Sequence, residues 1–323
     1  MRSRIHFRRL CGLVLAGLVL LAGARMTAAE GDDRFAWVRG DGWVALLDEA
    51  ERVVWRFNWG ERGAIPHFHP FGLAGGPPMT WHAPEDHPWH YGLWFAWKYI
   101  NGVNYWEFDR ETRRHAGWTI VEGAEITTRR DGSARIDLRL TYRPGPEADP
   151  VLREHRVIAV SAPGEDGGYH FDWRMTFRAA DVEVSLDRTP IPGQPEGRPW
   201  GGYAGLIWRF AREFADWQVV NDKGERDRAC HGRRARAIDF SGRIGGECMG
   251  VAIFDHPDNI RYPTPWYVGF DPKTPFACVL PAPLFESGLR LSPGGELTLR
   301  YRVAVHPGRL DAEALRAGHD DDY

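Results

Sequence analysis

The chain has 323 residues, of which 43% are hydrophobic and 26% charged, and its formal net charge at pH 7 is −3. Such a nearly balanced composition provides no strongly basic surface for a polyanion, so we expect no nucleic-acid partner. The length allows one large all-β domain or two smaller ones, and we expect one because no Ser/Pro-rich or charge-rich linker interrupts the chain.

The N-terminus has the pattern of a secretory signal peptide. Four arginines precede an apolar run from Leu10 to Ala24, and small residues follow it at Ala28 and Ala29. The run is shorter than the roughly 20 residues that a membrane-spanning helix needs. We therefore expect residues 1–29 to be cleaved, residues 30–323 to be periplasmic or secreted, and no stable membrane insertion. Because residues 1–29 hold five of the 41 basic residues and no acid, the mature part carries 36 basic and 44 acidic residues.

Three stretches in which apolar and polar residues alternate predict long β-strands, at residues 133–142, 171–177 and 297–305. Shorter strands are predicted at residues 43–47, 52–57, 118–121, 152–160, 182–186, 206–210, 217–220, 235–240, 249–254 and 276–280. Turn signals such as Asp131-Gly132 separate them. One segment, residues 310–317, is predicted to be helical, with Gly318 as its stop.

This pattern predicts an all-β fold. We expect a large antiparallel two-sheet sandwich, a supersandwich of the galactose-mutarotase-like type, with a short C-terminal helix and a single domain over residues 30–323. That part of the chain contains three cysteines, Cys230, Cys248 and Cys278. An odd and sparse set allows at most one disulfide, and the sequence does not specify its pairing.

The stretch from Pro66 to Phe108 holds five of the 13 histidines and five of the 15 tryptophans. Histidine titrates near neutral pH and binds metals, and tryptophan offers flat apolar faces, so this mixture suggests a functional site. Within it, His67 and His69 would project to the same side of an extended strand. One alternative is that they take part in a metal site or a catalytic site. The other is that both side chains are structural, packing on the neighbouring prolines or bonding to the backbone. Pro66 and Pro70 favour a strand at a sheet edge or a strand end that opens onto a cleft.

A second motif in this stretch places Asp86, His87 and His90 in a loop that Pro84 and Pro88 stiffen. A carboxylate beside an imidazole can orient or charge it, which suits general acid/base catalysis. The alternative is a loop whose histidines only bond to backbone groups.

Aromatic and polar residues follow, notably Trp94 and Trp106 with Asn104 and Glu107. We expect most aromatic side chains of this region in the core. One or two exposed rings beside polar groups would nevertheless bind a sugar, because the C–H faces of a sugar stack on indole and its hydroxyls need hydrogen bonds.

Two later segments add candidates. Trp200 and Tyr203 lie in a glycine-containing turn and are expected near a cleft. His256 and Asn259 lie in a proline-stiffened loop that follows a predicted strand. We expect this second histidine-bearing loop to close the same cleft.

Several of these motifs resemble the exported bacterial family that is commonly filed under the label methane oxygenase PmoA. The motifs are HFHP at residues 67–70, Asp86-His87-Pro88-x-His90-x-Gly92-Leu93-Trp94, NGVNYW at 101–106, GYAGL at 202–206, and DHPDN at 255–259 with PTPWY at 263–267. The resemblance covers most of the mature chain. It implies export, a β-rich fold and a setting among carbohydrate-degrading bacteria, in a functionally uncharacterised family that offers no established catalytic residues.

The leading hypothesis is an exported carbohydrate-active enzyme that performs acid/base chemistry on a sugar or glycoside, by hydrolysis, elimination or epimerisation. The catalytic candidates are His67, His69, Asp86, His87, His90, Glu107 and His256. The substrate-binding candidates are Trp94, Asn104, Trp106, Trp200, Tyr203 and Asn259. One alternative is a non-catalytic glycan-binding protein. The other is a metal-dependent enzyme with a divalent metal on His67, His69, His87 and His90, and otherwise no cofactor is expected.

Overall fold

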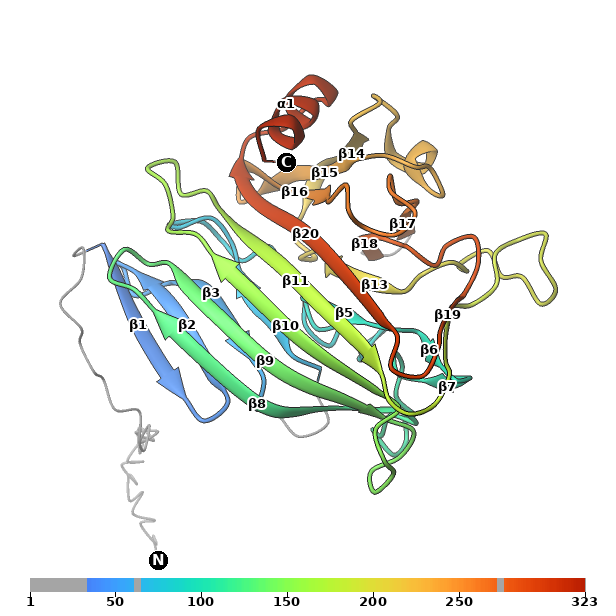
Figure 1. Cartoon of the computed structure of the whole chain (residues 1–323). Helices are drawn as coiled ribbons and strands as arrows, with labels where there is room; N and C mark the ends of the chain where they lie inside the picture. Colours follow the sequence, from blue (N-terminus) through green and yellow to red (C-terminus); the bar gives the residue numbers. More distant parts are fainter. Residues whose placement is uncertain (1–33, 61–64, 272–275, 323) are drawn as a thin grey trace, which may run out of the picture.

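The structure is a computed structural model that describes residues 34–60, 65–271 and 276–322. It is an all-β sandwich of two large antiparallel sheets with a short helix at the C-terminus (Figure 1), so the predicted fold class is confirmed. The predicted signal peptide, residues 1–29, lies outside the described residues. In the part of the chain that is described, no helix is long and apolar enough to cross a bilayer.

Among the described residues, each large sheet has eight strands. The first sheet consists, in spatial order, of β1 (Phe35–Gly40), β2 (Trp43–Asp48), β3 (Val53–Asn58), β4 (His67–Phe71), β5 (Leu93–Ala96), β13 (Gly205–Arg209), β18 (Phe276–Pro281) and β17 (Trp266–Asp271). The second sheet consists of β14 (Ala215–Asn221), β15 (Ala237–Ile244), β16 (Glu247–Asp255), β20 (Glu296–Pro307), β11 (Tyr169–Ala179), β10 (Leu152–Val160), β9 (Ala134–Arg143) and β8 (Trp118–Thr128). A smaller sheet consists of β19 (Leu289–Leu291), β12 (Val184–Asp187), β6 (Tyr99–Ile100) and β7 (Val103–Asn104).

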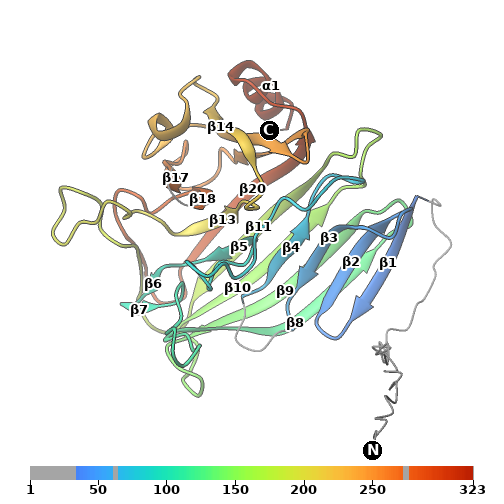
Figure 2. The same cartoon turned by 180° about the vertical axis from the view of Figure 1, so that it is seen from behind.

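The core lies between the two large sheets, which face each other in both views (Figures 1 and 2). In β10 and β11 buried and more exposed residues alternate, because successive side chains of a strand point to opposite faces. The inward Phe171 and Trp173 of β11 meet Phe68 of β4, with ring centroids 4.4 and 5.9 Å away. Burying a side chain of this size stabilises the fold by about 1.5–3 kcal/mol, so aromatic contacts of this kind hold the sheets together.

Strand β10 also places two charged side chains on its inward face. Glu154 and Arg156 are 3% and 0% exposed. Arg156 Nε lies 2.6 Å from Glu154 Oε1, and Arg156 Nη2 lies 3.0 Å from Glu154 Oε2. The Tyr142 hydroxyl of β9 donates a further hydrogen bond to Glu154 Oε2 at 2.5 Å. The two charges therefore neutralise each other within the core.

Side chains of β1 join the outermost strands of the two sheets, β1 and β8. Trp37 Nε1 donates to the Arg129 carbonyl at 2.8 Å. Arg39 Nη1 donates to the Ile126 carbonyl at 3.2 Å, and its Nη2 donates to the Thr128 hydroxyl at 2.8 Å. These contacts close one side of the sandwich.

Two strand predictions differ from the structure in the region that leads to the candidate site. All four residues of β5 are buried, so the strand lacks the alternating pattern and was not predicted. Strand β4 lies between β3 and β5, so of the two alternatives inferred from Pro66 and Pro70, a strand at a sheet edge was wrong. Only His67 and Phe68 pair with β5, and Pro70 lies beyond that pairing, where its missing N–H costs no hydrogen bond to β5.

The helix α1 spans Ala312–Asp322, so the predicted range of 310–317 was wrong at both ends. The Asp311 carboxylate accepts hydrogen bonds from the backbone N–H groups of Glu313 and Ala314, at 3.0 and 2.9 Å, and so caps the helix start. Gly318 lies inside the helix, and a Cβ at this position would approach the Phe254 ring to 3.2 Å. A small residue here lets α1 pack against the second sheet.

Candidate functional site

A pocket of about 900 Å³ brings together residues from several separate segments. It lies on the face of the first sheet that points away from the sandwich core. In β5, Leu93 and Phe95 belong to that core, whereas Trp94 and Ala96 pack into a second apolar cluster on the opposite face. Seven of the predicted site residues line this pocket: Asp86, His87, His90, Trp106, Glu107, Trp200 and Tyr203.

Asp86 and His87 form a hydrogen-bonded pair in the loop between β4 and β5. His87 Nδ1 lies 2.8 Å from Asp86 Oδ2. An ionised carboxylate accepts only, so Nδ1 carries the proton and Nε2 is the acceptor of the neutral ring. Arg209, at the end of β13 and fully buried, donates from Nη2 to both oxygens of Asp86, at 3.1 and 3.3 Å. The carboxylate is thus fixed between a cation and an imidazole.

The protonation states of this pair suit proton transfer at neutral pH. Burial lowers the pKa of His87 below 6.5, although the bond to Asp86 opposes this shift. Burial alone would raise the pKa of Asp86, but the hydrogen bond from His87 and the charge of Arg209 lower it below 3.8. At pH 7 the imidazole is therefore neutral and the carboxylate is ionised.

His90 stacks on His87, with ring centroids 4.7 Å apart and ring planes inclined by 26°. His90 is 3% exposed, and its Nδ1 has no hydrogen-bond partner among the described residues. Burial lowers the pKa of His90 well below 6.5. The wall behind His87 is therefore a neutral ring at pH 7.

Glu107 is the second carboxylate of the pocket, and three side chains hold it. The Lys98 ammonium forms an ion pair with Oε2, Asn104 Nδ2 donates to the same oxygen at 2.6 Å, and the Tyr203 hydroxyl donates to Oε1 at 2.8 Å. Burial alone would raise the pKa of Glu107, but Lys98 and the two hydrogen bonds lower it. Glu107 is therefore ionised at neutral pH. Asn104 does not line the pocket and acts as a positioning residue for this carboxylate.

Aromatic side chains form much of the remaining wall. The rings of Trp106 and Tyr203 lie 5.0 Å apart, and those of Tyr203 and Tyr267 lie 5.7 Å apart. Trp200 is 56% exposed, which makes it the most exposed large hydrophobic side chain of the described residues. The pocket therefore offers ring faces beside two carboxylates.

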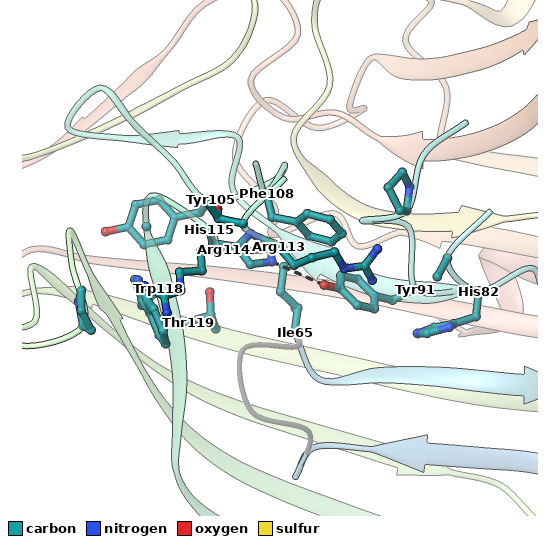
Figure 3. Close-up of a pocket in the computed structure, with 15 residues that line it drawn as sticks. Ile65, His82, Tyr91, Tyr105, Phe108, Arg113, Arg114, His115, Trp118 and Thr119 are labelled. Carbon is teal, nitrogen blue, oxygen red and sulfur yellow. Dashed lines mark hydrogen bonds between the residues drawn. The ribbon is translucent and has the colours of Figure 1, made fainter. Parts of the chain in front are cut away.

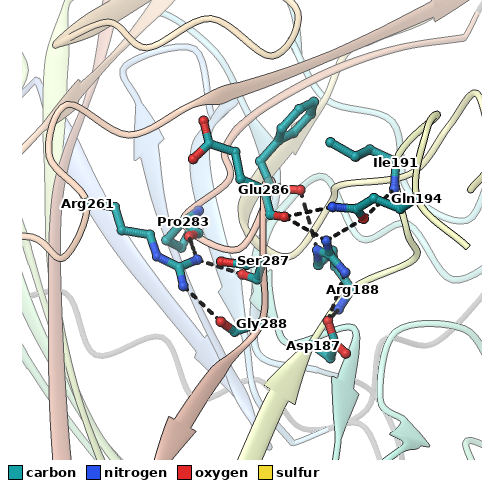
Figure 4. A network of polar contacts seen from close by, with 10 residues as sticks. Asp187, Arg188, Ile191, Gln194, Arg261, Pro283, Glu286, Ser287 and Gly288 are labelled. Carbon is teal, nitrogen blue, oxygen red and sulfur yellow. Dashed lines mark hydrogen bonds and ion pairs between the residues drawn. The ribbon is translucent and has the colours of Figure 1, made fainter.

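A network of polar contacts anchors the loop that carries Trp200 (Figure 4). Arg188 Nη2 and Gln194 Nε2 both donate to the Glu286 carbonyl at 2.9 Å. From another side, Arg261 donates to three carbonyls of the same segment, those of Pro283, Ser287 and Gly288. Arg261 thus fixes the segment from 283 to 288, and this segment holds Arg188 and Gln194, which precede Trp200 in the loop.

The site also contains residues that were not predicted, among them Arg209, Lys98 and His231. His231 lines the pocket, with its Nδ1 3.1 Å from the Val268 carbonyl. Arg209 and Lys98 carry a signal that was available, because each is a charged residue inside an otherwise apolar run. Cys278 also lines the pocket, and it is a free thiol, as are Cys230 and Cys248.

His67 and His69 do not line this pocket. Both rings stack on His82, with centroids 5.1 and 5.2 Å away, so they share one side of β4. His67 Nδ1 bonds to the Ile65 carbonyl and His69 Nδ1 to the Thr80 hydroxyl, each at 2.8 Å. These contacts match the structural alternative for the pair.

We expect this histidine cluster to make stability fall in acid. Burial, with smaller contributions from the neighbouring His82 and Arg56, lowers the pKa of His67 to about 3 and that of His69 to about 4. Because both values lie below the unfolded value of about 6.5, the stabilisation is complete above that pH, is lost progressively as the pH falls, and is gone once the pH has passed through the folded values of about 4 and 3. The melting temperature should therefore fall less steeply with acid for His69→Gln than for the wild-type protein. Equal slopes would contradict this assignment.

Three more predicted residues lie outside the pocket lining. Trp94 is fully buried and packs against His90 and Trp106, with ring centroids 5.1 and 5.8 Å away, so it supports the wall from behind. Asn259 is 5% exposed and bonds to the Asp255 carboxylate and the Arg300 backbone. His256 Nδ1 accepts from the Asp258 N–H at 3.0 Å. The 255–259 loop therefore does not close this pocket.

The four histidines considered as metal ligands fall into two groups. His87 and His90 line the pocket, whereas His67 and His69 stack on His82. Within the ranges that the structure describes, no group of three or more histidine, cysteine, aspartate or glutamate side chains is placed to hold a metal ion.

The fold and the site define an all-β sandwich protein with a polar, aromatic-lined pocket on the outer face of one sheet. The chain belongs to DUF6807, a family of unknown function, whose family model matches residues 25–319. This match supports the uncharacterised family that the motifs suggested, whereas the label methane oxygenase PmoA stays a resemblance. No curated protein matches the chain in sequence.

Among the solved structures with distant similarity to the chain are the following two. A 4-alpha-glucanotransferase from Thermococcus litoralis has 12% sequence identity and a TM-score of 0.23, and the match covers 84% of this chain and 39% of that one. A TPR-domain containing protein from Parabacteroides distasonis has 8% identity and a TM-score of 0.26, and the match covers 87% of this chain and 48% of that one. The chain thus spans less than half the length of either protein, and similarity at these TM-scores carries no functional argument.

Proposed function

We propose that this protein is a carbohydrate-active enzyme in which His87 acts as a general base on a sugar bound in the 900 Å³ pocket. The observation that carries the proposal is the 2.8 Å hydrogen bond between His87 Nδ1 and Asp86 Oδ2 at the pocket wall. A carboxylate that holds the Nδ1 proton leaves Nε2 to accept a proton from the substrate, and it stabilises the imidazolium that forms.

The charges of the pocket favour proton abstraction over glycoside hydrolysis. Hydrolysis by two carboxyl groups needs one of them protonated, with a raised pKa. The pKa values of Asp86 and Glu107 are both lowered, so neither is a proton donor at neutral pH. A neutral His87 instead suits removal of a proton from a sugar carbon or hydroxyl, as in elimination or epimerisation.

The other pocket residues support a sugar as the ligand. Trp200 and Tyr203 offer ring faces on which the C–H faces of a sugar can stack, and the buried Trp106 packs against Tyr203. The Glu107 carboxylate accepts hydrogen bonds from hydroxyls. Burial raises the pKa of Tyr203, so its hydroxyl keeps the proton that it donates to Glu107. The predicted signal peptide adds a periplasmic or secreted location to the proposal.

The direct test is incubation of the purified mature protein in D₂O with a panel of neutral and acidic mono- and oligosaccharides, followed by proton NMR. Abstraction from carbon gives deuterium incorporation or an unsaturated product, and hydrolysis gives new reducing ends. Deuterium incorporation or an unsaturated product would support the proposal. Hydrolysis as the only reaction would refute the assigned chemistry. The proposal would be overturned if the protein neither bound nor converted any sugar of the panel.

The exposed indole of Trp200 favours a second candidate function, that of a non-catalytic glycan-binding protein. Under either function we expect Trp200→Ala to weaken sugar binding up to about tenfold, because an aromatic stacking contact contributes about 0.5–1.5 kcal/mol. Isothermal titration calorimetry with a sugar from the panel measures the change. The matched control is Val182→Ala, since Val182 is 46% exposed and lies outside the pocket. If the wild-type protein, Trp200→Ala and Val182→Ala bound the sugar with equal affinity, Trp200 would not be part of the binding site.

A further inference from the structure

A second pocket, of about 640 Å³, shares the β4–β5 loop and the segment after β7 with the first (Figure 3). From the loop, Pro88 and Tyr91 line this second pocket, whereas Trp89 and His90 line the first. From the segment after β7, the second pocket is lined by Tyr105 and Phe108 and the first by Trp106 and Glu107. One layer of chain therefore separates two pockets.

The charged residues of the two pockets differ. The first is lined by the carboxylates of Asp86 and Glu107, which pair with Arg209 and Lys98, and by Arg228. The second contains the guanidinium groups of Arg113 and Arg114, and none of its described lining residues is acidic. Within the described ranges, neither guanidinium has a carboxylate within ion-pair distance. The second pocket is therefore suited to an anion.

The loop that presents these two arginines is built around Asp109. Its carboxylate accepts hydrogen bonds from the N–H and the hydroxyl of Thr112, at 2.8 and 2.9 Å, so it is occupied within the loop. Backbone bonds join Arg113 N to Asp109 O at 2.8 Å and Asp109 N to Arg114 O at 2.9 Å. Arg113 has a φ of 56°, in the left-handed region that a non-glycine residue adopts only when its surroundings enforce it. Such enforced conformations cluster at ligand-binding sites.

The remaining wall is aromatic and neutral. The Arg113 guanidinium lies 4.8 Å from the Phe108 ring centroid, and Trp118 and Tyr105 also line the pocket. The Tyr91 hydroxyl lies 3.4 Å from His115 Nε2. Burial lowers the pKa of His115 to about 4, so the positive charge at pH 7 comes from the two arginines alone. Ring faces beside paired guanidiniums match a ligand with both an apolar face and an anionic group.

We propose that this second pocket binds a carboxylate-bearing sugar ring, a uronate, with its carboxylate on Arg113 and Arg114 and its C–H face on the aromatic wall. Guanidinium groups bind carboxylates through parallel charge-assisted hydrogen bonds, and aromatic rings stack on sugar C–H faces. The proposal does not rest on the function of the first pocket, because the two sites share no lining residue.

The test is calorimetric titration of the mature protein with D-glucuronate, D-glucose and inorganic phosphate at low ionic strength. We expect glucuronate to bind, glucose to bind at least about tenfold more weakly, and the double variant Arg113→Gln/Arg114→Gln to lose at least about tenfold in affinity for glucuronate. Both arginines are exposed, so the variant should fold, which its melting temperature verifies.

The matched control is Arg129→Gln/Arg130→Gln, an adjacent pair of exposed arginines after β8 and outside both pockets. This control should bind glucuronate like the wild-type protein, because both of its arginines lie outside the second pocket. The proposal is overturned if glucose binds as tightly as glucuronate, or if the control pair loses as much as the pocket pair. It is also overturned if phosphate binds and glucuronate does not, because the site would then be an anion site that does not accept the sugar ring.

Discussion

Replacing His87 with alanine is expected to reduce kcat for a sugar substrate by about two to four orders of magnitude, because the variant lacks the proposed general base. The side chain is 35% exposed, so its removal leaves no large cavity in the core. Asp86 keeps its hydrogen bonds to Arg209, so the loop retains its anchor. The measurement is steady-state kinetics with the sugar identified by NMR, and KM should change far less than kcat.

The pH profile gives a second readout of the same variant. Since the folded pKa of His87 lies below 6.5, wild-type kcat should be constant above that pH and fall as acid protonates the ring. The residual activity of His87→Ala should lack this acid limb. The matched control is His155→Ala, because His155 Nε2 also lies 2.8 Å from a carboxylate, Asp137 Oδ1, but on β10 outside the pocket. Equal activity of His87→Ala and wild type would exclude His87 as the base.

Site residues that are neighbours in the sequence were predicted together, whereas a residue far away along the chain was missed. Asp86, His87 and His90 lie within five residues in one loop, so their spacing alone indicated a shared site. Arg209 reaches the same carboxylate from 123 residues further along the chain. It does so because β13 pairs with β5, with Trp208 opposite Leu93. A single sequence contains no record of that pairing, so only the unusual charge in an apolar strand could have drawn attention to Arg209.

The same reasoning explains which strands were predictable. β10 was predicted over its full length, because one face is buried and the other is in water. β5 is buried on both faces, against the core on one and against the second apolar cluster, around Trp94 and Ala96, on the other, and therefore shows no period of two. The position of α1 depends on the Asp311 cap and on contact between Gly318 and Phe254, and that contact is a tertiary one.

Replacing Arg156 with alanine is expected to destabilise the fold by about 3–5 kcal/mol, because it leaves the buried Glu154 carboxylate without its counterion. Arg156 is fully buried, and two of its nitrogens lie 2.6 and 3.0 Å from the carboxylate oxygens. Urea unfolding followed by circular dichroism measures the change. The matched control is Arg135→Ala, whose partner Asp137 lies 3.4 Å away in an exposed pair and whose loss should cost less than about 1 kcal/mol.

A double variant separates the charge from the packing. In Glu154→Leu/Arg156→Met no uncompensated charge remains in the core, so this protein should be more stable than Arg156→Ala. The Tyr142 hydroxyl would lose its acceptor, so full recovery is not expected. A cost for Arg156→Ala no greater than that for Arg135→Ala would contradict the role assigned to the buried pair.

The contacts of Trp37 and Arg39 with β8 bear on how the protein behaves when it is concentrated. The outermost strand of a sheet exposes backbone groups that can recruit a strand of another molecule and start aggregation. In β8 the Ile126 carbonyl already accepts from Arg39, the Arg129 carbonyl just beyond the strand accepts from Trp37, and the register shifts between Val121 and Gly123. An incoming strand would have to displace these donors and match an irregular edge. This side of the sandwich is therefore protected against edge-to-edge association.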